Sequence, residues 1–367
     1  MKKKIILIVF LPKFVVSGAG NSVFKLIQGL PKNKFTIYII CFGKCEYKNK
    51  FSKKIKTYEL KYQRLISAFY TIHRIIKKIN IKHKNEKNIF FSNHHYANIF
   101  ALSIKLIFKK IKVIGVERTA IHELDVFFTF KEYFKKKILL FCVKNLYKYL
   151  DKIVSNSKYV ENEINKFSNK NSMTIYPPSL EKLYQIKSFI KKDKKEISIL
   201  MVGRLDDEKG IKTALKAISL LNYKIILTIA GRGSSFQKKQ LLNYKSNNNK
   251  LILLGHKNNL KRYYEGADLF INTSHFEGFS NAITEALNYE VPVIASDCPG
   301  GNNEILKYGK FGQLFETNNP ADLSIKIQKF FNNKRLFKKK TLLGKKSLKR
   351  FTVSKNINKY SKLFKNI

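Results

Sequence analysis

The chain alternates short, unbroken apolar runs with longer segments of helical spacing. Ile5 to Leu11 and Phe35 to Phe42 are such runs in the first half, and Ile197 to Val202, Asp268 to Asn272 and Pro292 to Ser296 are similar runs in the second half. Apolar runs of this length are typical of strands buried on both faces of a parallel sheet. Because segments of helical composition separate them, the pattern predicts an α/β protein built from βαβ units.

The pattern breaks once near the middle of the chain. Tyr176-Pro177-Pro178 is a rigid interruption, and Glu181 to Glu196 is rich in lysine with little periodicity. We therefore place a domain boundary and a hinge here, with residues 1–175 forming one domain and residues 176–350 a second. A length of 367 residues agrees with about two domains.

In the stretch from Asp268 to Glu304, the residue types and their spacing suggest a catalytic or ligand-binding site. Two carboxylates, Glu277 and Glu285, lie eight residues apart around a predicted helix that spans residues 282–289. Gly278 and the cap candidates Ser280 and Asn281 place Glu277 before the helix, so both carboxylates can face one ligand. The helix follows the carboxyl end of a strand, where its free amides and dipole suit a diphosphate.

Two other segments follow predicted strands. In Gly203-Arg204-Leu205-Asp206-Asp207-Glu208-Lys209-Gly210, the cations Arg204 and Lys209 can converge on one anion. Near the N-terminus, the loop 17–21 contains Gly18 and Gly20 and precedes a helix predicted from about Val23 to Leu30. Such a loop allows close backbone approach to a phosphate or sugar, although a tight turn explains it equally well.

The adjacent histidines His94 and His95 follow the predicted strand at residues 88–92. They indicate either a site at a strand end or ordinary surface histidines, and we rank His95 above His94 as a catalytic candidate. A further strand, Lys112 to Val116, ends in Glu117 and Arg118.

Together these motifs resemble the retaining nucleotide-sugar glycosyltransferases of family 4, which have an E-x(7)-E signature and a G-R-L-x-x-x-K-G segment. The resemblance covers most of the chain and is strongest in its second half. It implies the GT-B fold, in which two Rossmann-like domains have parallel sheets that face each other across a cleft. The N-terminal domain would hold the acceptor and the C-terminal domain the donor. The helix predicted at residues 351–367 would return to complete the first domain.

The resemblance also implies roles for individual residues. Glu285 would bind the donor ribose, and Glu277 would contact the transferred sugar near the reacting carbon. Arg204 and Lys209 would bind the donor diphosphate. The remaining donor-binding residues that it implies are Gly18, Gly20, Gly278, Phe279, Ser280 and Asn281. Some branches of the family have a histidine after the strand at residues 112–116, where this chain has Glu117 and Arg118, and this departure leaves the catalytic contact of the N-terminal domain open.

The predicted reaction is a metal-independent transfer that needs no cofactor, because fixed cations and helix amides would stabilise the departing diphosphate. The resemblance favours a UDP-sugar donor and a glycan or polyprenyl-diphosphate-linked acceptor in cell-surface polysaccharide or lipopolysaccharide synthesis. Rival enzymes are a GT-B-fold epimerase, a phosphorylase, and a glycoside hydrolase with Glu277 and Glu285 as its acid and base.

The charge of the chain suggests partners of another kind. The 72 Lys and Arg residues against 25 Asp and Glu give a formal net charge of +47, which favours anionic membranes, nucleic acid or phosphorylated ligands. Most of these cations are dispersed lysines, whereas a reader of nucleic acid tends to concentrate arginine among aromatic residues. We therefore expect no specific nucleic acid partner, and a nucleic-acid-binding protein stays the alternative from outside the enzymes.

We expect the protein in the cytoplasm, peripherally attached to the inner face of the cell membrane. The N-terminal apolar run is short, ends at Pro12 and lacks a small-residue cleavage site, so it reads as a strand rather than a signal peptide. The cysteines (Cys41, Cys45, Cys142 and Cys298) have no zinc-site spacing beyond one C-x(3)-C and favour free thiols. Lys131 to Leu150 mixes lysines with apolar residues, which fits either a helix lying on an anionic membrane or a core helix.

Overall fold

The computed structural model describes residues 4–62, 64–125, 129–184, 196–243 and 249–367. The chain divides into two units, the first made of residues 1–181 and 351–367 and the second of residues 182–350. The hinge predicted from Glu181 to Glu196 falls largely on residues 185–195, which lie outside the described residues.

The first unit extends to Glu181, whereas the sequence placed the boundary after residue 175. The reason is a backbone pairing with the last part of the chain. The amides of Ser179 and Leu180 donate to the carbonyl of Phe351 at 3.2 and 3.3 Å, and the Val353 amide donates to the carbonyl of Leu180 at 2.8 Å. These bonds tie the segment after the two prolines to the first unit.

In its described residues, the first unit has a seven-stranded parallel sheet with the order β3-β2-β1-β4-β5-β6-β7. The strands are β1 (Ile5–Phe10), β2 (Phe35–Phe42), β3 (Lys56–Leu60), β4 (Lys87–Asn93), β5 (Lys112–Glu117), β6 (Lys152–Ser155) and β7 (Ser172–Thr174). The helices are α1 (Gly18–Gly29), α2 (Leu65–Lys82), α3 (His95–Ile107), α4 (Phe130–Leu146), α5 (Lys158–Phe167) and α13 (Val353–Asn366).

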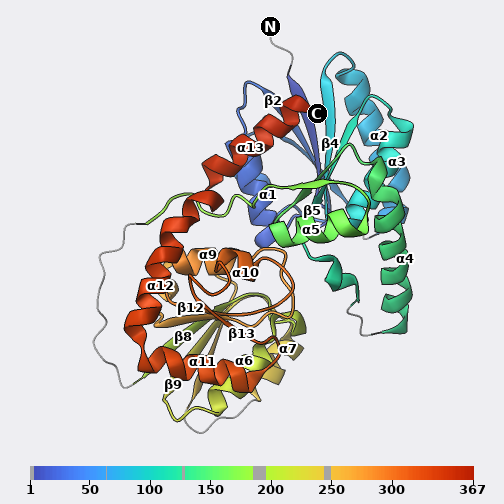
Figure 1. Cartoon of the computed structure of the whole chain (residues 1–367). Coiled ribbons are helices and arrows are strands. Elements are labelled where there is room, and N and C mark those ends of the chain that lie inside the picture. The colour runs from blue at the N-terminus through green and yellow to red at the C-terminus, as the bar shows by residue number, and fades with distance from the viewer. Residues whose placement is uncertain (1–3, 63, 126–128, 185–195, 244–248) are drawn as a thin grey trace. The chain divides into compact units, whose positions relative to one another are not determined.

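The apolar run of β1 explains why this sheet is covered on both faces. Every residue from Ile5 to Phe10 is buried. Alternate side chains enter two separate cores, with Ile6 and Ile8 in one and Leu7 and Val9 in the other. The first core packs against α2, α3 and α4, and the second packs against α1 and α13, as Figure 1 shows.

In its described residues, the second unit has a six-stranded parallel sheet with the order β10-β9-β8-β11-β12-β13. The strands are β8 (Ile197–Val202), β9 (Ile225–Ala230), β10 (Lys250–Gly255), β11 (Leu269–Asn272), β12 (Val293–Ser296) and β13 (Gln313–Phe315). The helices are α6 (Ile211–Ser219), α7 (Ser235–Leu242), α8 (Lys261–Gly266), α9 (Asn281–Asn288), α10 (Asn302–Ile305), α11 (Pro320–Asn332) and α12 (Lys334–Ser347). The prediction of two α/β domains with parallel sheets is confirmed.

Each sheet has a point where the strand order reverses. In the first unit β1 lies between β2 and β4, and in the second unit β8 lies between β9 and β11. Connections leave such a point toward opposite sides, so a crevice opens outside the carboxyl ends of the strands, and ligands of open α/β sheets bind there. The predicted site residues follow the strands on both sides of these two points.

Candidate functional site

The loop after β8 carries two cations to the strand-order reversal of the second unit. A short 3-10 turn at Asp207–Lys209 leads into Gly210, whose φ is +58°. A Cβ at Gly210 would lie 2.1 Å from the carbonyl oxygen of Thr273, so only glycine allows the loop after β11 to pass this closely. The Thr273 hydroxyl donates to the Lys209 carbonyl at 2.7 Å and holds the two loops together.

Lys209 and Glu277 form an ion pair at this place. Lys209 Nζ lies 2.6 Å from Glu277 Oε1, and the Ser274 hydroxyl donates to the same oxygen at 2.8 Å. Burial opposes the charge of Glu277, but Lys209 and the neighbouring hydrogen bonds outweigh it and lower the carboxyl pKa. Burial likewise opposes the charge of Lys209, and Glu277 outweighs it and raises the lysine pKa. Both groups are therefore charged at neutral pH.

The backbone of Glu277 is held by the segment that follows β12. Its amide donates to the Pro299 carbonyl at 3.0 Å, and its carbonyl accepts from the Gly301 amide at 3.2 Å. At Gly300, where φ is +132°, a Cβ would lie 1.4 Å from the Glu277 carbonyl oxygen. These contacts fix the position of Glu277 before any ligand arrives.

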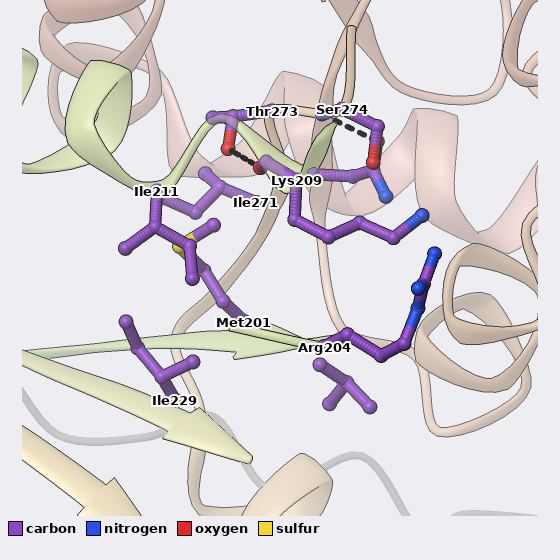
Figure 2. Close-up of a pocket in the computed structure, with 11 residues that line it drawn as sticks. Met201, Arg204, Lys209, Ile211, Ile229, Ile271, Thr273 and Ser274 are labelled. Atoms are coloured by element: carbon purple, nitrogen blue, oxygen red, sulfur yellow. Dashed lines mark hydrogen bonds between the residues drawn. The ribbon is translucent and has the colours of Figure 1, made fainter. Parts of the chain in front are cut away.

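Arg204 is the more accessible of the two cations, with 62% of its side chain exposed. Its guanidinium pairs with Asp206 at 2.8 Å and with Glu208 at 2.7 Å. Figure 2 shows the side chains of Arg204 and Lys209 reaching toward each other along one side of a pocket. The rest of that pocket is lined by the ends of β8 and β11 and the start of α6, including Met201, Ile211, Ile271, Thr273 and Ser274. The structure thus brings together the two cations and Glu277.

The start of α9 follows Glu277 directly. Gly278, Phe279 and Ser280 are buried, and Asn281 begins the helix. Ser280 occupies the N-cap position, but within the described chain its side chain makes no capping hydrogen bond. The amides and dipole of this helix start therefore act at the same edge of the sheet as Lys209.

Glu285 lies inside α9 and is oriented by a tyrosine that the sequence interpretation missed. The hydroxyl of Tyr264 donates to Glu285 Oε2 at 2.9 Å. Tyr264 is buried and stacks on Tyr289 with ring centroids 5.3 Å apart. Burial, and after it the Glu285 carboxylate, raise the pKa of Tyr264 well above its usual value, so the tyrosine stays a hydrogen-bond donor. Its place on α8, 21 positions before Glu285, left no local pattern that could have revealed this contact.

The start predicted for the first helix is wrong, and with it the extent of the glycine-rich loop before that helix. Helix α1 already begins at Gly18, so Gly18 and Gly20 lie in its first turn. Ser17 is the N-cap, and its side chain accepts a hydrogen bond from the Gly20 amide at 3.1 Å. A Cβ at Gly20 would lie 2.0 Å from the Val15 carbonyl oxygen, so the close packing of these two backbone segments requires a glycine at this position. A donor contact of Gly18 and Gly20 stays a prediction.

His95 lies in a buried ionic network of the first unit. It is 3% exposed, and its Nδ1 lies 2.6 Å from Oε2 of Glu117, which is fully buried. Glu117 Oε1 accepts from Asn98 Nδ2 at 2.6 Å and from the Tyr147 hydroxyl. Burial opposes both charges, yet each partner favours the other's charge, so the His95 pKa is raised and the Glu117 pKa is lowered. The second ring nitrogen of His95 lies 3.3 Å from the Thr119 hydroxyl.

These contacts place both ring nitrogens of His95 against protein groups. The catalytic role predicted for His95 stays a prediction, and the contacts suit a residue that positions the start of α3. The sequence interpretation noted Glu117 and Arg118 only as a departure from a family pattern. It could not pair Glu117 with His95, because that contact depends on how α3 packs beside β5.

Groups of three or more His, Cys, Asp or Glu side chains that could hold a metal ion do not occur in the part of the chain that the structure describes. In the same residues, every helix is too short or too polar to cross a bilayer.

Known proteins resemble this chain in sequence and in fold. Residues 185–350, which make up almost all of the second unit, match the model of the family described as glycosyl transferases group 1. An uncharacterised glycosyltransferase of Methanocaldococcus jannaschii is 26% identical over 284 residues, which cover 68% of each chain. The GalNAc-α-(1→4)-GalNAc-α-(1→3)-diNAcBac-PP-undecaprenol α-1,4-N-acetyl-D-galactosaminyltransferase of Campylobacter jejuni is 26% identical over 351 residues, 92% of each chain.

Solved structures give the same fold. The Anabaena protein HepE, in complex with UDP-glucose, superposes with a TM-score of 0.80 at 14% identity and covers 99% of this chain and 100% of its own. The fold is therefore that of the GT-B glycosyltransferases. The match to the family model and to relatives named as glycosyltransferases shows that the chain is a glycosyltransferase. Its second unit is a group 1 glycosyltransferase domain.

Proposed function

We propose that this enzyme is a retaining glycosyltransferase of family 4. Its donor would be a nucleoside-diphosphate sugar, and we propose a UDP-sugar. The observation that carries the proposal is the convergence of Arg204, Lys209 and Glu277 at the strand-order reversal of the group 1 domain. Two cations beside a helix start suit a diphosphate, and an adjacent carboxylate suits the hydroxyls of the attached sugar. The bound UDP-glucose of HepE, a protein of the same fold, supports the choice of nucleotide.

The charge state of Glu277 distinguishes transfer from hydrolysis by acid catalysis. A glycosidase acid must be protonated, which requires a raised pKa. Lys209 and the hydrogen bonds around Glu277 lower its pKa instead. An ionised Glu277 can accept hydrogen bonds from the sugar and stabilise positive charge that develops at the reacting carbon.

The departing diphosphate gains negative charge as the sugar leaves. Arg204, Lys209 and the start of α9 would stabilise that charge without reorganising, because the protein already holds them in place. We therefore propose that transfer does not need a divalent metal ion. On binding, the diphosphate would compete with Glu277 for Lys209 and with Asp206 and Glu208 for Arg204.

The acceptor that we propose is a glycan, free or linked to a polyprenyl diphosphate, in cell-surface polysaccharide synthesis. The support is the Campylobacter jejuni relative, whose name gives an undecaprenol-linked acceptor and which matches this chain over 92% of its length. An acceptor of this kind lies at a membrane surface, so the enzyme itself would have to reach the inner face of the cell membrane.

Helix α4 supports such an attachment. Its buried residues, Leu139, Leu140 and Val143, pack into the core. On the opposite side of the helix, large apolar side chains are exposed, namely Phe130 (77%), Phe134 (52%), Ile138 (63%) and Phe141 (67%). At 100° per residue they fall within an arc of about 80°, so they form one stripe along the helix. We call these residues the α4 stripe.

Lysines flank the α4 stripe on both sides. Lys131 and Lys135 lie along one edge, and Lys137 and Lys144 lie along the other, by the same helical geometry. An exposed apolar stripe bordered by cations is the pattern of a helix that rests on an anionic bilayer. The net charge of +47 favours the same surface over a second copy of this cationic chain. We therefore propose that the α4 stripe binds an anionic lipid surface.

The experiment that tests the proposed reaction follows the sugar directly. The purified enzyme is incubated in EDTA with UDP-glucose, UDP-N-acetylglucosamine or UDP-N-acetylgalactosamine and a polyprenyl-diphosphate-linked glycan. We expect release of UDP that depends on the acceptor, and an axial anomeric configuration in both donor and product by NMR. An inverted product would contradict the retaining mechanism, and activity that EDTA abolishes and Mg²⁺ restores would contradict metal independence.

A further inference from the structure

The first unit contains a buried cation that the proposed donor site does not use. Arg118 follows β5 and is only 7% exposed. Its Nε and Nη2 donate to Asn93 Oδ1 at 3.0 and 2.8 Å. Among the residues that the structure describes, no carboxylate pairs with Arg118, and its Nη1 has no hydrogen-bond partner. The neighbouring Glu117 cannot neutralise it, because consecutive residues of a strand point to opposite faces and Glu117 pairs with His95.

Arg118 lies at the strand-order reversal of the first unit. Asn93, which orients the Arg118 guanidinium, is the last residue of β4. The side-chain Nδ2 of Asn93 donates to the carbonyl of Phe10, the last residue of β1, at 3.2 Å. This bond joins the two strands between which the order reverses. Ligands of open parallel sheets bind at this kind of point, outside the carboxyl ends of the strands.

Other polar groups around Arg118 are also incompletely satisfied. Asn156, just after β6, donates to the Arg118 carbonyl at 2.6 Å, but its own Oδ1 is buried and has no partner in the described residues. His94 is half-buried, with φ of +77°, and its imidazole makes no hydrogen bond to any described residue. Burial, and after it the Arg118 charge, lower the His94 pKa to about 4, so His94 is a neutral imidazole at pH 7.

An isolated charge in a protein interior is costly unless a counter-charge reaches it. Hydrogen bonds that the Arg118 guanidinium donates to one amide oxygen orient it but do not cancel its charge. We propose that Arg118, with His94, binds an oxyanion carried by one of the two reactants. This inference rests on the proposed glycosyl transfer and names a charged group of its substrates. The oxyanion is a phosphate of the acceptor or the carboxylate of a transferred uronic acid, each of which presents two oxygens that match the fork of a guanidinium.

Inorganic phosphate is the first probe. Because the diphosphate site also binds anions, the test uses a background in which Arg204→Met and Lys209→Met remove its cations. We expect phosphate, compared with NaCl of equal ionic strength, to raise the Tm of this background by about 2–3 °C at ten times its Kd. Adding Arg118→Met should abolish that rise. A rise of equal size with Arg118→Met, or no rise in the background, would overturn the proposal.

Folding controls are built into the same series. Without phosphate, Arg118→Met should keep or raise Tm, because it replaces a buried charge by an apolar chain of similar length. Should that variant not fold, Arg118→Lys keeps the charge but loses the fork that Asn93 orients, and it should bind phosphate about tenfold more weakly. Unchanged phosphate affinity in Arg118→Lys would count against the site. Loss of nucleotide binding elsewhere in the protein would leave these results unaffected, so failure of the proposed function is distinguishable.

Two further probes identify the source of the oxyanion. If a uronic acid carries it, the wild type should bind UDP-glucuronic acid about tenfold more tightly than UDP-glucose, and Arg118→Met should remove this preference. If the acceptor carries it, the two donors should bind equally, and glucose 1-phosphate should raise Tm only when Arg118 is present. Failure of both arms would contradict the proposal that a reactant brings the anion.

Discussion

Lys209 Nζ lies 2.6 Å from Glu277 Oε1, so two motifs that are 68 positions apart in sequence meet through one ion pair. The side chains are only 20% and 14% exposed, which limits screening by solvent. In the absence of donor, each charge satisfies the other. A donor diphosphate that takes Lys209 would release Glu277 toward the sugar, which makes the pair a preformed part of the site.

The ion pair should show a measurable coupling energy. We expect Lys209→Met and Glu277→Gln each to destabilise the protein, because each leaves a largely buried partner without its counter-charge. A double-mutant cycle from urea unfolding should give a coupling of about 1–3 kcal/mol. The exposed pair Lys261–Glu265, whose side chains are 55% and 44% exposed, is the control and should give a small coupling that falls with added salt. Additive effects at Lys209 and Glu277 would contradict the pairing.

Arg204 should contribute to binding of the second phosphate group. Its side chain is 62% exposed and is held by Asp206 and Glu208, so Arg204→Met should leave Tm nearly unchanged. We expect the substitution to weaken binding of UDP about tenfold, the effect of one lost charge-assisted hydrogen bond, and binding of UMP much less. Calorimetric titration of both nucleotides measures this difference. Equal losses for UDP and UMP would place Arg204 away from the terminal phosphate.

The buried pair His95–Glu117 should make stability depend on pH. The raised His95 pKa means that its contribution is fully present below the unfolded value of about 6.5 and is lost as pH rises through the folded pKa. The lowered Glu117 pKa means that its contribution is present above about 4.3 and is lost as pH falls through the folded pKa.

The double variant His95→Gln/Glu117→Gln lacks both titrations and serves as the reference. The Tm difference between wild type and this variant should be largest between about pH 4.5 and 6.5 and should shrink toward pH 9. A difference that stays constant from pH 5 to 9 would contradict a raised pKa of His95, and a difference that grows as pH rises would show that His95 is neutral in the folded protein.

The α4 stripe should govern binding to anionic vesicles. We expect the wild type to sediment with vesicles of phosphatidylglycerol and phosphatidylcholine, and to bind pure phosphatidylcholine far less. Replacing Phe134 and Phe141 by Ser should reduce binding on the order of tenfold, because each removes apolar area from the bilayer.

The control for this experiment replaces Leu342 and Leu343, exposed apolar residues of α12, by Ser and should leave vesicle binding unchanged. Light scattering reports whether the stripe pairs two copies instead. A dimer that the Phe134→Ser/Phe141→Ser variant abolishes, together with vesicle binding that it leaves unchanged, would contradict the lipid surface.

The sequence predicted those parts of the fold whose signals are local. Buried strands such as Ile5–Phe10 and Ile197–Val202 are continuous apolar runs, and Gly210 and Glu277 belong to motifs that are contiguous in sequence. The strands β3 (Lys56–Leu60), β7 (Ser172–Thr174) and β13 (Gln313–Phe315) were missed, because they are short edge strands with polar residues that only pairing with a neighbour defines.

The contacts that position the site were not predictable in the same way. Tyr264 reaches Glu285 from a different helix, and His95, at the start of α3, reaches Glu117 at the end of β5. Both depend on how helices pack against strands, and neither leaves a periodic trace in the sequence. The start of α1 was misplaced because glycines usually indicate a loop, whereas Ser17 caps the helix and close packing against Val15 requires a glycine at position 20.

Binding of nucleotides in EDTA to the wild type and to Glu285→Ala tests most directly whether the second unit holds the donor at this site. UDP, GDP, ADP and CMP are compared by thermal shift, with Glu265→Ala, an exposed glutamate of α8, as the control. We expect UDP to raise the Tm of the wild type and of the control, and we expect Glu285→Ala to lose this effect. If no nucleotide binds, or if Glu285→Ala binds UDP as well as the wild type does, the second unit does not hold its donor at this site.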